Sequence, residues 1–163
     1  MNKYIGVKEI KAMPMTRAEY NKYRGWELPS DENGYDDGFL VEYIDGGQAN
    51  HHAHDGYISW SPEDVFARAY RPVSGMTFGL AVEAMKKGLK VARAGWNGKG
   101  MFVVYQKGST IPCNSQTASA YGMKEGDIFE CRPYLQLRCA DGSHQMWQPS
   151  VSDCLEEDWS VVS

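Results

Sequence analysis

The sequence predicts an α+β protein, in which an antiparallel sheet with one long helix packed on it follows a small α+β N-terminal module. Three observations support this prediction. Short runs rich in β-branched and aromatic residues alternate with Asp-Gly and Asn-Gly turns, which is typical of antiparallel strands. Helix-capping signatures recur along the chain. Pro, Ser and Gly gather at residues 71–75 between two of these signatures, so we place a boundary between a domain at 1–75 and a domain at 76–163.

The N-terminal module is predicted to hold a short helix followed by two strands. The hydroxyl of Thr16 and the carboxylate of Glu19 form a capping box that satisfies two free amides, and the helix should run to about Tyr23. Turn residues follow, and strands are expected at 39–43 and 56–60 because both runs are β-rich and flanked by glycine.

A second helix of this module is predicted to begin after Ser61. Ser61 would be the N-cap, and Pro62 would occupy the first helical position, where its missing amide does no harm. Asp64 would complete the capping box. The helix should run to about Tyr70.

The C-terminal domain is predicted to open with the long helix. Thr77 is its N-cap, Gly88 ends it in a left-handed conformation, and one face presents an apolar stripe at the spacing of a buried helix surface. The stripe consists of Phe78, Ala81, Val82 and Met85.

The remaining elements of this domain are predicted mainly as strands. Strands at 89–94 and 101–106 should flank a glycine-rich loop that contains an Asn-Gly hairpin signal. Residues 107–133 are mixed, with a turn of helix at 115–121. Strands at 134–139 and 143–148 should form a hairpin whose Asp-Gly pair adopts a type I′ turn. A short helix should begin at 150–153, and residues 159–162 should form an edge strand.

Charge and composition exclude several classes of protein. The net charge is −4, and the whole acidic excess lies in residues 1–75, so neither half carries the basic surface that duplex DNA or RNA requires. No apolar run is long enough for a membrane helix. The first ten residues lack the basic and apolar segments of a secretory signal, and we therefore expect a cytosolic protein with reduced cysteines.

Motifs for catalysis are weak. Gly98-Lys99 does not make a phosphate-binding loop, because Arg93 stands where that motif needs glycine and Gly100 where it needs Ser or Thr. The histidines His51, His52 and His54 lie beside Asp55 and could bind a metal, or they could form a solvated loop cluster. No local pattern places a nucleophile beside a histidine. We expect a protein that is not an enzyme and that needs no cofactor.

Features for ligand binding are stronger, because indole rings adjoin amides at several turns of the second half. Trp96-Asn97, the segment from Trp147 to Ser150, and Asp158-Trp159 share this composition. A nucleotide base can stack on an indole while amides read its edge, and the amides of the helix that opens at Ser150 could meet a phosphate. The alternative is that the indoles fill the core of a small sheet domain, and for Trp159 we favour this core position.

Three sequence segments, taken in order, resemble a known family. The runs Met76–Met85 and Val91–Met101, followed by Met146–Ser150 and an Asp153 to Glu157-Asp158-Trp159 ending, are similar to the small phage domain family that includes the second Thoeris anti-defence proteins. The resemblance covers residues 76–163 and leaves the N-terminal module outside.

The resemblance implies a function, an assembly and a site. Proteins of that family bind the NAD-derived signal glycocyclic ADP-ribose and withhold it without cleaving it, some relatives bind cyclic dinucleotides, and the family forms homotetramers with pockets at subunit interfaces. The same resemblance implies that the protein acts in the cytosol of an infected bacterium. Carried over to this sequence, the ligand-binding candidates are Trp96, Asn97, Trp147, Gln148, Ser150, Asp153 and Arg93.

Two alternative functions follow from other parts of the chain. One is a metal-assisted phosphodiesterase that degrades such a signal with His51, His52, His54 and Asp55. The other is a phage inhibitor that binds a protein through the acidic N-terminal module. The role of residues 1–75, and whether Tyr121 or Arg132 of the 107–133 segment approaches a ligand, stay open at this point.

Overall fold

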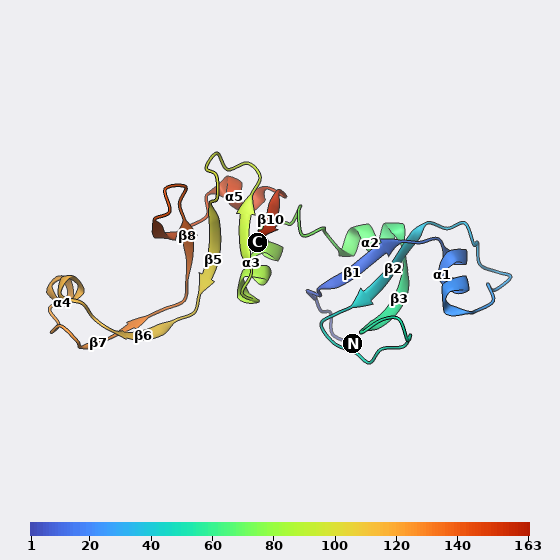
Figure 1. Cartoon of the computed structure of the whole chain (residues 1–163), viewed down its shortest axis with the longest axis horizontal. Coiled ribbons are helices and arrows are strands. Elements are labelled where there is room, and N and C mark those ends of the chain that lie inside the picture. Colours follow the sequence, from blue (N-terminus) through green and yellow to red (C-terminus); the bar gives the residue numbers. More distant parts are fainter. The chain divides into compact units, whose positions relative to one another are not determined.

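A computed structural model describes all residues from 1 to 163, and it divides the chain into two compact units, residues 1–71 and residues 72–163 (Figure 1). Both units combine short helices with antiparallel strands, so the predicted α+β class is confirmed. The helix predicted to open the second domain is present, but it is short, so the expectation of one long helix is not confirmed. No helix in the structure is long and apolar enough to cross a membrane.

The N-terminal unit is a three-stranded antiparallel sheet with two short helices. The strand order is β1 (Ile10–Pro14), β2 (Gly38–Tyr43) and β3 (Tyr57–Pro62), joined with helices α1 (Arg17–Arg24) and α2 (Glu63–Ala69). Strand β1 was not predicted from the sequence. The core of this unit is small and consists of Tyr20, Leu40 and Ile58, with Met15 and Trp60 packed against it.

The predicted capping box of α1 is confirmed, whereas the predicted start of α2 is wrong. The Thr16 hydroxyl accepts from the Glu19 amide, and the Glu19 carboxylate accepts from the Thr16 amide. Pro62, in contrast, still belongs to β3, and no side chain caps α2. The sheet explains this difference: Pro62 lies opposite Gly38 in the β2–β3 ladder, so the helix begins only at Glu63.

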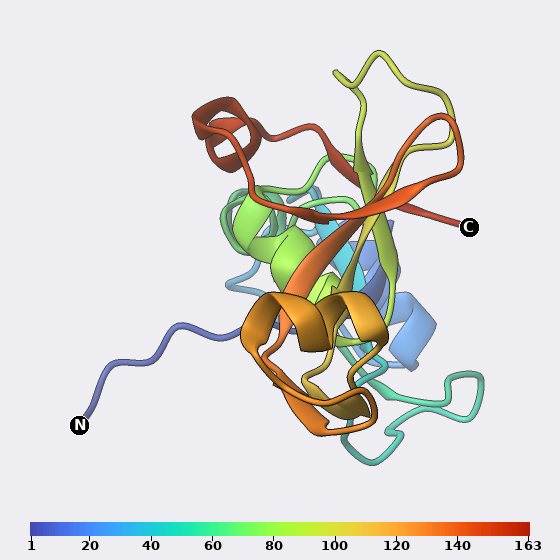
Figure 2. The same ribbon diagram turned by 90° about the vertical axis from the view of Figure 1, so that its left-hand side faces the viewer.

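The C-terminal unit contains a five-stranded antiparallel sheet in the order β10, β4, β5, β8, β9. Its strands are β4 (Lys90–Arg93), β5 (Phe102–Gln106), β8 (Tyr134–Arg138), β9 (His144–Trp147) and β10 (Trp159–Val162). Helix α3 (Phe78–Lys86) and helix α5 (Val151–Leu155) contact each other and lie on the same side of the strands (Figure 2). Strand β10 is an edge strand, as predicted.

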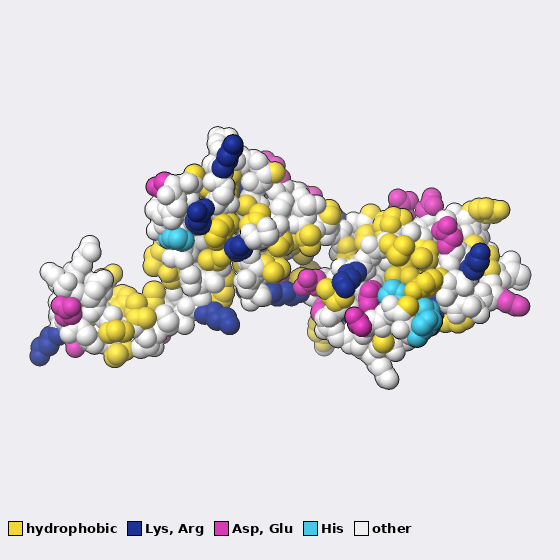
Figure 3. Space-filling model, in the orientation of Figure 1, with side chains coloured by type: hydrophobic (Ala, Val, Ile, Leu, Met, Phe, Trp, Pro, Cys, Tyr) yellow, Lys and Arg dark blue, Asp and Glu magenta, His cyan; other side chains and the backbone are white.

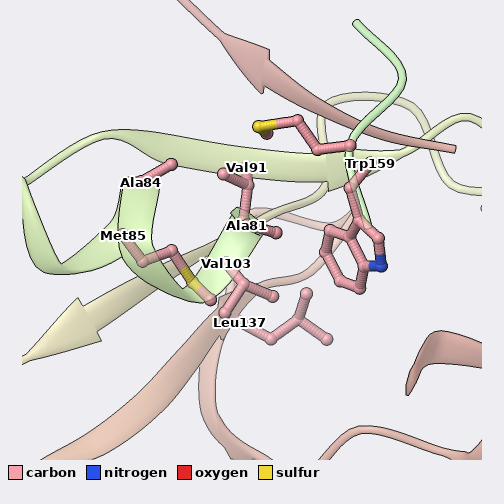
Figure 4. Packing of buried hydrophobic residues seen from close by; sticks show 8 residues of the cluster. Ala81, Ala84, Met85, Val91, Val103, Leu137 and Trp159 are labelled. Carbon is pink, nitrogen blue, oxygen red and sulfur yellow. The ribbon is translucent and has the colours of Figure 1, made fainter. Parts of the chain in front are cut away.

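The core of this unit lies between α3 and the sheet. Ala81 and Met85 of α3 face Val91, Val103 and Trp159, and these side chains are nearly inaccessible to solvent (Figure 4). These five residues come from four different elements, α3, β4, β5 and β10. Strand pairing therefore brings the helix and the two ends of the domain around one apolar centre.

Helix α3 begins and ends where the sequence predicts, but its nine residues make it a short helix. The Thr77 hydroxyl accepts from the Leu80 amide, which confirms the predicted N-cap. Gly88 has a φ of 91°, its amide donates to the Met85 carbonyl, and the Leu89 amide donates to the Ala84 carbonyl. This is a Schellman motif, which requires the left-handed glycine and stops the helix before β4.

A two-stranded arm accounts for the mixed segment between β5 and β8. Strands β6 (Ser109–Pro112) and β7 (Ile128–Cys131) pair with each other and carry helix α4 (Ser115–Tyr121) at their far end (Figure 1). The helical turn at 115–121 is confirmed. The arm strands were not predicted.

The type I′ turn predicted at Asp141-Gly142 is wrong, and the Asn97-Gly98 hairpin signal does not form such a turn either. No residue other than glycine has a positive φ, so neither Asn97 nor Asp141 adopts the conformation that such a turn needs. Between β8 and β9 the Cys139 carbonyl accepts from the amide of Gly142, whose φ is 87°. The loop is thus a three-residue hairpin loop with glycine in the left-handed position, and the hairpin itself is confirmed.

Candidate ligand-binding site

Three tryptophans from distant parts of the C-terminal unit meet in one cluster. The ring centroids of Trp96 and Trp147 lie 5.9 Å apart with an interplanar angle of 72°. Trp159 lies 5.4 Å from Trp96 and 6.0 Å from Trp147, again edge to face. Edge-to-face contacts of this kind stabilise aromatic pairs beyond their buried area. The cluster therefore joins the glycine-rich loop, the end of β9 and the start of β10.

The three indoles differ in exposure. Trp159 is fully buried and donates its Nε1 hydrogen to the carbonyl of Asp153 at 2.9 Å, so the predicted core position of Trp159 is confirmed. Trp96 and Trp147 are half-buried and pack against the same core. Each of these two indoles thus has one part in the core and another part at the surface.

Asp153 is the hydrogen-bonding centre beneath the indoles. Its Oδ1 accepts from Arg93 Nη1 at 2.9 Å and from Trp96 Nε1 at 3.2 Å. Its Oδ2 accepts from the backbone amide of Ser150 at 2.9 Å and from the Ser150 hydroxyl at 2.7 Å. A carboxylate has about four acceptor sites. All four are used within the chain, so Asp153 holds the site together and has no acceptor left for a ligand.

The same contacts occupy the start of α5. The Ser150 hydroxyl accepts from the Asp153 amide at 3.1 Å, and the two residues form a capping box at the start predicted for this helix. Because the cap satisfies these groups, and because α5 has only five residues, its first turn does not offer the phosphate site considered from the sequence.

Arg93 completes a partly buried ion network with a second carboxylate, that of Asp158. Its Nε and Nη2 donate to Asp158 at 2.7 Å and 3.2 Å, in addition to the bond from Nη1 to Asp153. Two carboxylates surround one guanidinium, whose side chain is 11% exposed. The pair of negative charges disfavours a phosphate beside Arg93, and we therefore regard this residue as a structural cation.

The network shifts the pKa values of its members in the directions expected for ion pairs. Burial by itself raises the pKa of Asp153, but the hydrogen bonds from Ser150, Arg93 and Trp96 outweigh it and lower the pKa to about 2. The bond from Arg93 also lowers the pKa of Asp158. The bonds to Asp158 and Asp153 raise the pKa of Arg93. All three groups are therefore charged at neutral pH.

Asn97 and Gln148 are the exposed amides of the site. Each follows one of the half-buried tryptophans directly in the sequence, and the contact between Trp96 and Trp147 brings their two segments together. Neither amide makes a hydrogen bond within the chain that would occupy its side chain. Of the residues named from the sequence, these two amides and the outer parts of the two indoles are the groups open to a ligand.

Asp158 was noted in the sequence only as the neighbour of Trp159 and was not among the predicted ligand-binding residues. Its Oδ2 also accepts from the amide of Gly95 at 2.9 Å, so it ties the end of the chain to the start of the glycine-rich loop. Asp158 belongs to the Glu157-Asp158-Trp159 motif by which the sequence resembles the family. No local pattern in the sequence, however, shows that its carboxylate pairs with Arg93.

The histidines of the N-terminal unit contact other side chains of the same unit. His54 contacts Glu42 through Nδ1 at 3.1 Å and the hydroxyl of Tyr23 through Nε2 at 2.9 Å. His51 stacks on Tyr23, with ring centroids 4.6 Å apart. The histidines gather on one face of this unit (Figure 3). No group of three His, Cys, Asp or Glu side chains in residues 1–163 is placed to hold a metal ion.

A groove of about 580 Å³ also lies in the N-terminal unit. It is lined by Arg17, Asp31, Glu32, Asn33, Asp36, Trp60 and Pro62. Its single arginine pairs with Glu32 and lies 5.0 Å from the centre of the Trp60 ring. The remaining carboxylates leave an acidic lining, which disfavours an anionic nucleotide.

Comparison with known proteins places the C-terminal unit in a family. Residues 76–162 match the family model of the Thoeris anti-defense 2-like domain. A protein of Bacillus phage SP01 named Thoeris anti-defense 2 is 35% identical over 91 residues, which cover 54% of this chain and 96% of that relative. The three indoles and the Arg93 network lie inside the matched range, and residues 1–75 lie outside the family match. The chain belongs to the Thoeris anti-defense 2 family.

Proposed function

We propose that this protein is a phage anti-defence protein that binds and sequesters a cyclic nucleotide signal without cleaving it. The signal would be NAD-derived, of the glycocyclic ADP-ribose type, or a cyclic dinucleotide, and its removal would block activation of the effector. Family membership supports the anti-defence role. The observation that carries the ligand class is the contact of Trp96 with Trp147, which brings together two indoles that are each followed in the sequence by an exposed side-chain amide.

The exposed groups suit a nucleotide. An indole face can stack on a base, with a stabilisation of about 1 to 3 kcal/mol for each base. The side-chain amides of Asn97 and Gln148 can donate to and accept from base edges and ribose hydroxyls. Lys99 is exposed in the same loop as Trp96 and Asn97 and offers a positive charge for a phosphate. The proposed ligand contacts are therefore stacking, amide hydrogen bonds and one mobile cation.

The proposal is non-catalytic because the polar groups beneath the indoles already pair with one another. Asp153, Asp158 and Arg93 are held in fixed ion pairs, and none of them has a pKa suited to proton transfer near neutral pH.

We also propose that the protein forms a homotetramer with ligand pockets between subunits. In that case each pocket needs groups from two chains, and dilution should weaken ligand binding together with assembly.

A release experiment tests sequestration. The purified full chain is incubated with glycocyclic ADP-ribose or a cyclic dinucleotide, separated from free nucleotide and heat-denatured, and the released compound is identified by mass spectrometry. Recovery of the intact nucleotide is expected. A hydrolysed product would make the protein an enzyme, and a chelator arm would then test the metal-assisted alternative with the histidine cluster. Failure to retain any nucleotide would refute the proposal.

Matched variants locate the binding site. The double variant Trp96→Ala, Trp147→Ala should lose the bound nucleotide. Trp26→Ala is the control, because Trp26 is 53% exposed and belongs to the N-terminal unit. Equal retention by both variants would place the ligand elsewhere. An anti-defence effect that survives loss of the indoles would favour the protein-binding alternative.

A further inference from the structure

The carboxylate of Asp158 fixes the hinge at residues 93–95, where β4 ends and the glycine-rich loop begins. It binds Arg93, the last residue of β4, through both oxygens, and it accepts from the backbone amide of Gly95 two residues later. The backbone of Asp158 contributes as well, since its carbonyl accepts from the Ala94 amide at 3.1 Å. Three successive residues are thus fixed by one residue near the end of the chain.

The indole of Trp96 is held by the other half of the same network. Its Nε1 donates to Asp153, which shares Arg93 with Asp158. Its backbone amide donates to the Arg93 carbonyl at 3.3 Å. The orientation of Trp96 therefore depends on a chain of contacts that starts at Asp158, passes through Arg93 and Asp153, and ends at the ring, while the bond from Gly95 to Asp158 holds the adjacent backbone.

We propose that Asp158 is a positioning residue, which fixes the Trp96 indole before a ligand arrives. A preorganised ring spares the ligand the cost of ordering the loop, so Asp158 strengthens binding without touching the ligand. The part of this proposal that concerns binding rests on the proposed function. The part that concerns the orientation of Trp96 does not.

Asp158→Asn tests the proposal, because the amide keeps the size of the side chain and removes its charge. Charge-assisted hydrogen bonds are about twice as strong as neutral ones, and we expect nucleotide binding to weaken about tenfold. In the free protein, the NMR resonance of the Trp96 indole N–H should shift and broaden; Trp96→Phe identifies this resonance. Glu156→Gln is the matched control, since it removes one negative charge from an exposed position two residues away.

Gly95→Ala perturbs the same hinge without removing a charge, and it serves if Asp158→Asn fails to fold. A Cβ at position 95 would lie 3.1 Å from Asp158 Oδ2 and 3.4 Å from Arg93 Nη2, so the Asp158 carboxylate has to shift by a few tenths of an ångström away from the Gly95 amide. The same resonance shift and the same loss of affinity are expected. An unchanged Trp96 resonance in both variants would overturn the proposal.

The two proposals fail in different ways. If the wild-type protein retains no glycocyclic ADP-ribose and no cyclic dinucleotide, the proposed function fails, and the Trp96 resonance of the free variants still decides the role of Asp158. If the wild type binds and both variants bind equally well at a temperature at which they are folded, only the positioning role of Asp158 is refuted.

Discussion

Replacement of Asp153 by Asn should destabilise the C-terminal unit by an amount that depends on pH. The folded-state pKa of Asp153 is about 2 instead of the ordinary 3.8, and one pKa unit corresponds to about 1.4 kcal/mol. The ionised carboxylate thus contributes about 2 kcal/mol to the free energy of unfolding. Because the folded-state pKa is the lower one, this contribution is complete above about pH 4 and is lost as the pH falls towards 2.

Urea unfolding of the wild type and of Asp153→Asn measures this contribution. The NMR signal of the Trp159 indole N–H reports on the C-terminal unit, because that group donates to the backbone of residue 153. The two proteins should differ by about 2 kcal/mol at pH 7 and should converge near pH 2. Glu125→Gln, at an exposed position of the arm, should match the wild type at both pH values.

Two results would refute the reasoning about Asp153. Equal free energies of unfolding at pH 7 would mean that the carboxylate charge does not stabilise the fold. A difference that persists unchanged at pH 2 would mean that Asn disturbs the packing, since at that pH the carboxyl of the wild type is about half protonated in the folded state and almost fully protonated in the unfolded state, so that most of its charge contribution is lost.

Three further predictions concern packing, binding and the sheet of the N-terminal unit. Trp159→Ala should cost about 3 to 5 kcal/mol of stability, because it removes a fully buried ring, and a small change in melting temperature would contradict the core position. Asn97→Ala and Gln148→Ala should each leave the free energy of unfolding within about 0.5 kcal/mol of the wild-type value, because both side chains are exposed. Each variant should nevertheless bind the nucleotide more weakly in calorimetry. Gly38→Ala should destabilise the β2–β3 pairing, since a Cβ there would lie 2.4 Å from the carbonyl oxygen of Ser61; circular dichroism on heating would detect this, and a wild-type curve would exclude the clash.

Elements with strong local signals could be predicted from the sequence. Capping at Thr16, Thr77 and Ser150 depends on hydrogen bonds to residues three positions away, so the required side chains are visible in the sequence itself. Gly88 is equally local, because its positive φ decides where α3 ends. The arm strands β6 and β7 escaped prediction because their pairing partners stand on either side of α4 and carry no strong alternation.

Errors arose where tertiary contacts override a local signal. Pro62 has the sequence context of a helix start, but its pairing with Gly38 keeps it in β3. Asp141-Gly142 has the composition of a type I′ turn, but the register of β8 and β9 selects a three-residue loop in which only the glycine has a positive φ.

The sequence by itself determined the α+β class, the three caps and the ordered motifs that mark the family, because these depend on residues close together in the chain. The tertiary structure decided which of the candidate residues face a ligand. Asp153 and Asp158 lie 60 and 65 positions from Arg93, and only the pairing of β10 with β4 and the packing of α5 against α3 bring them to it. Once they meet, the two carboxylates and the guanidinium pair with one another, and Asn97, Gln148 and the indole surfaces are left for binding.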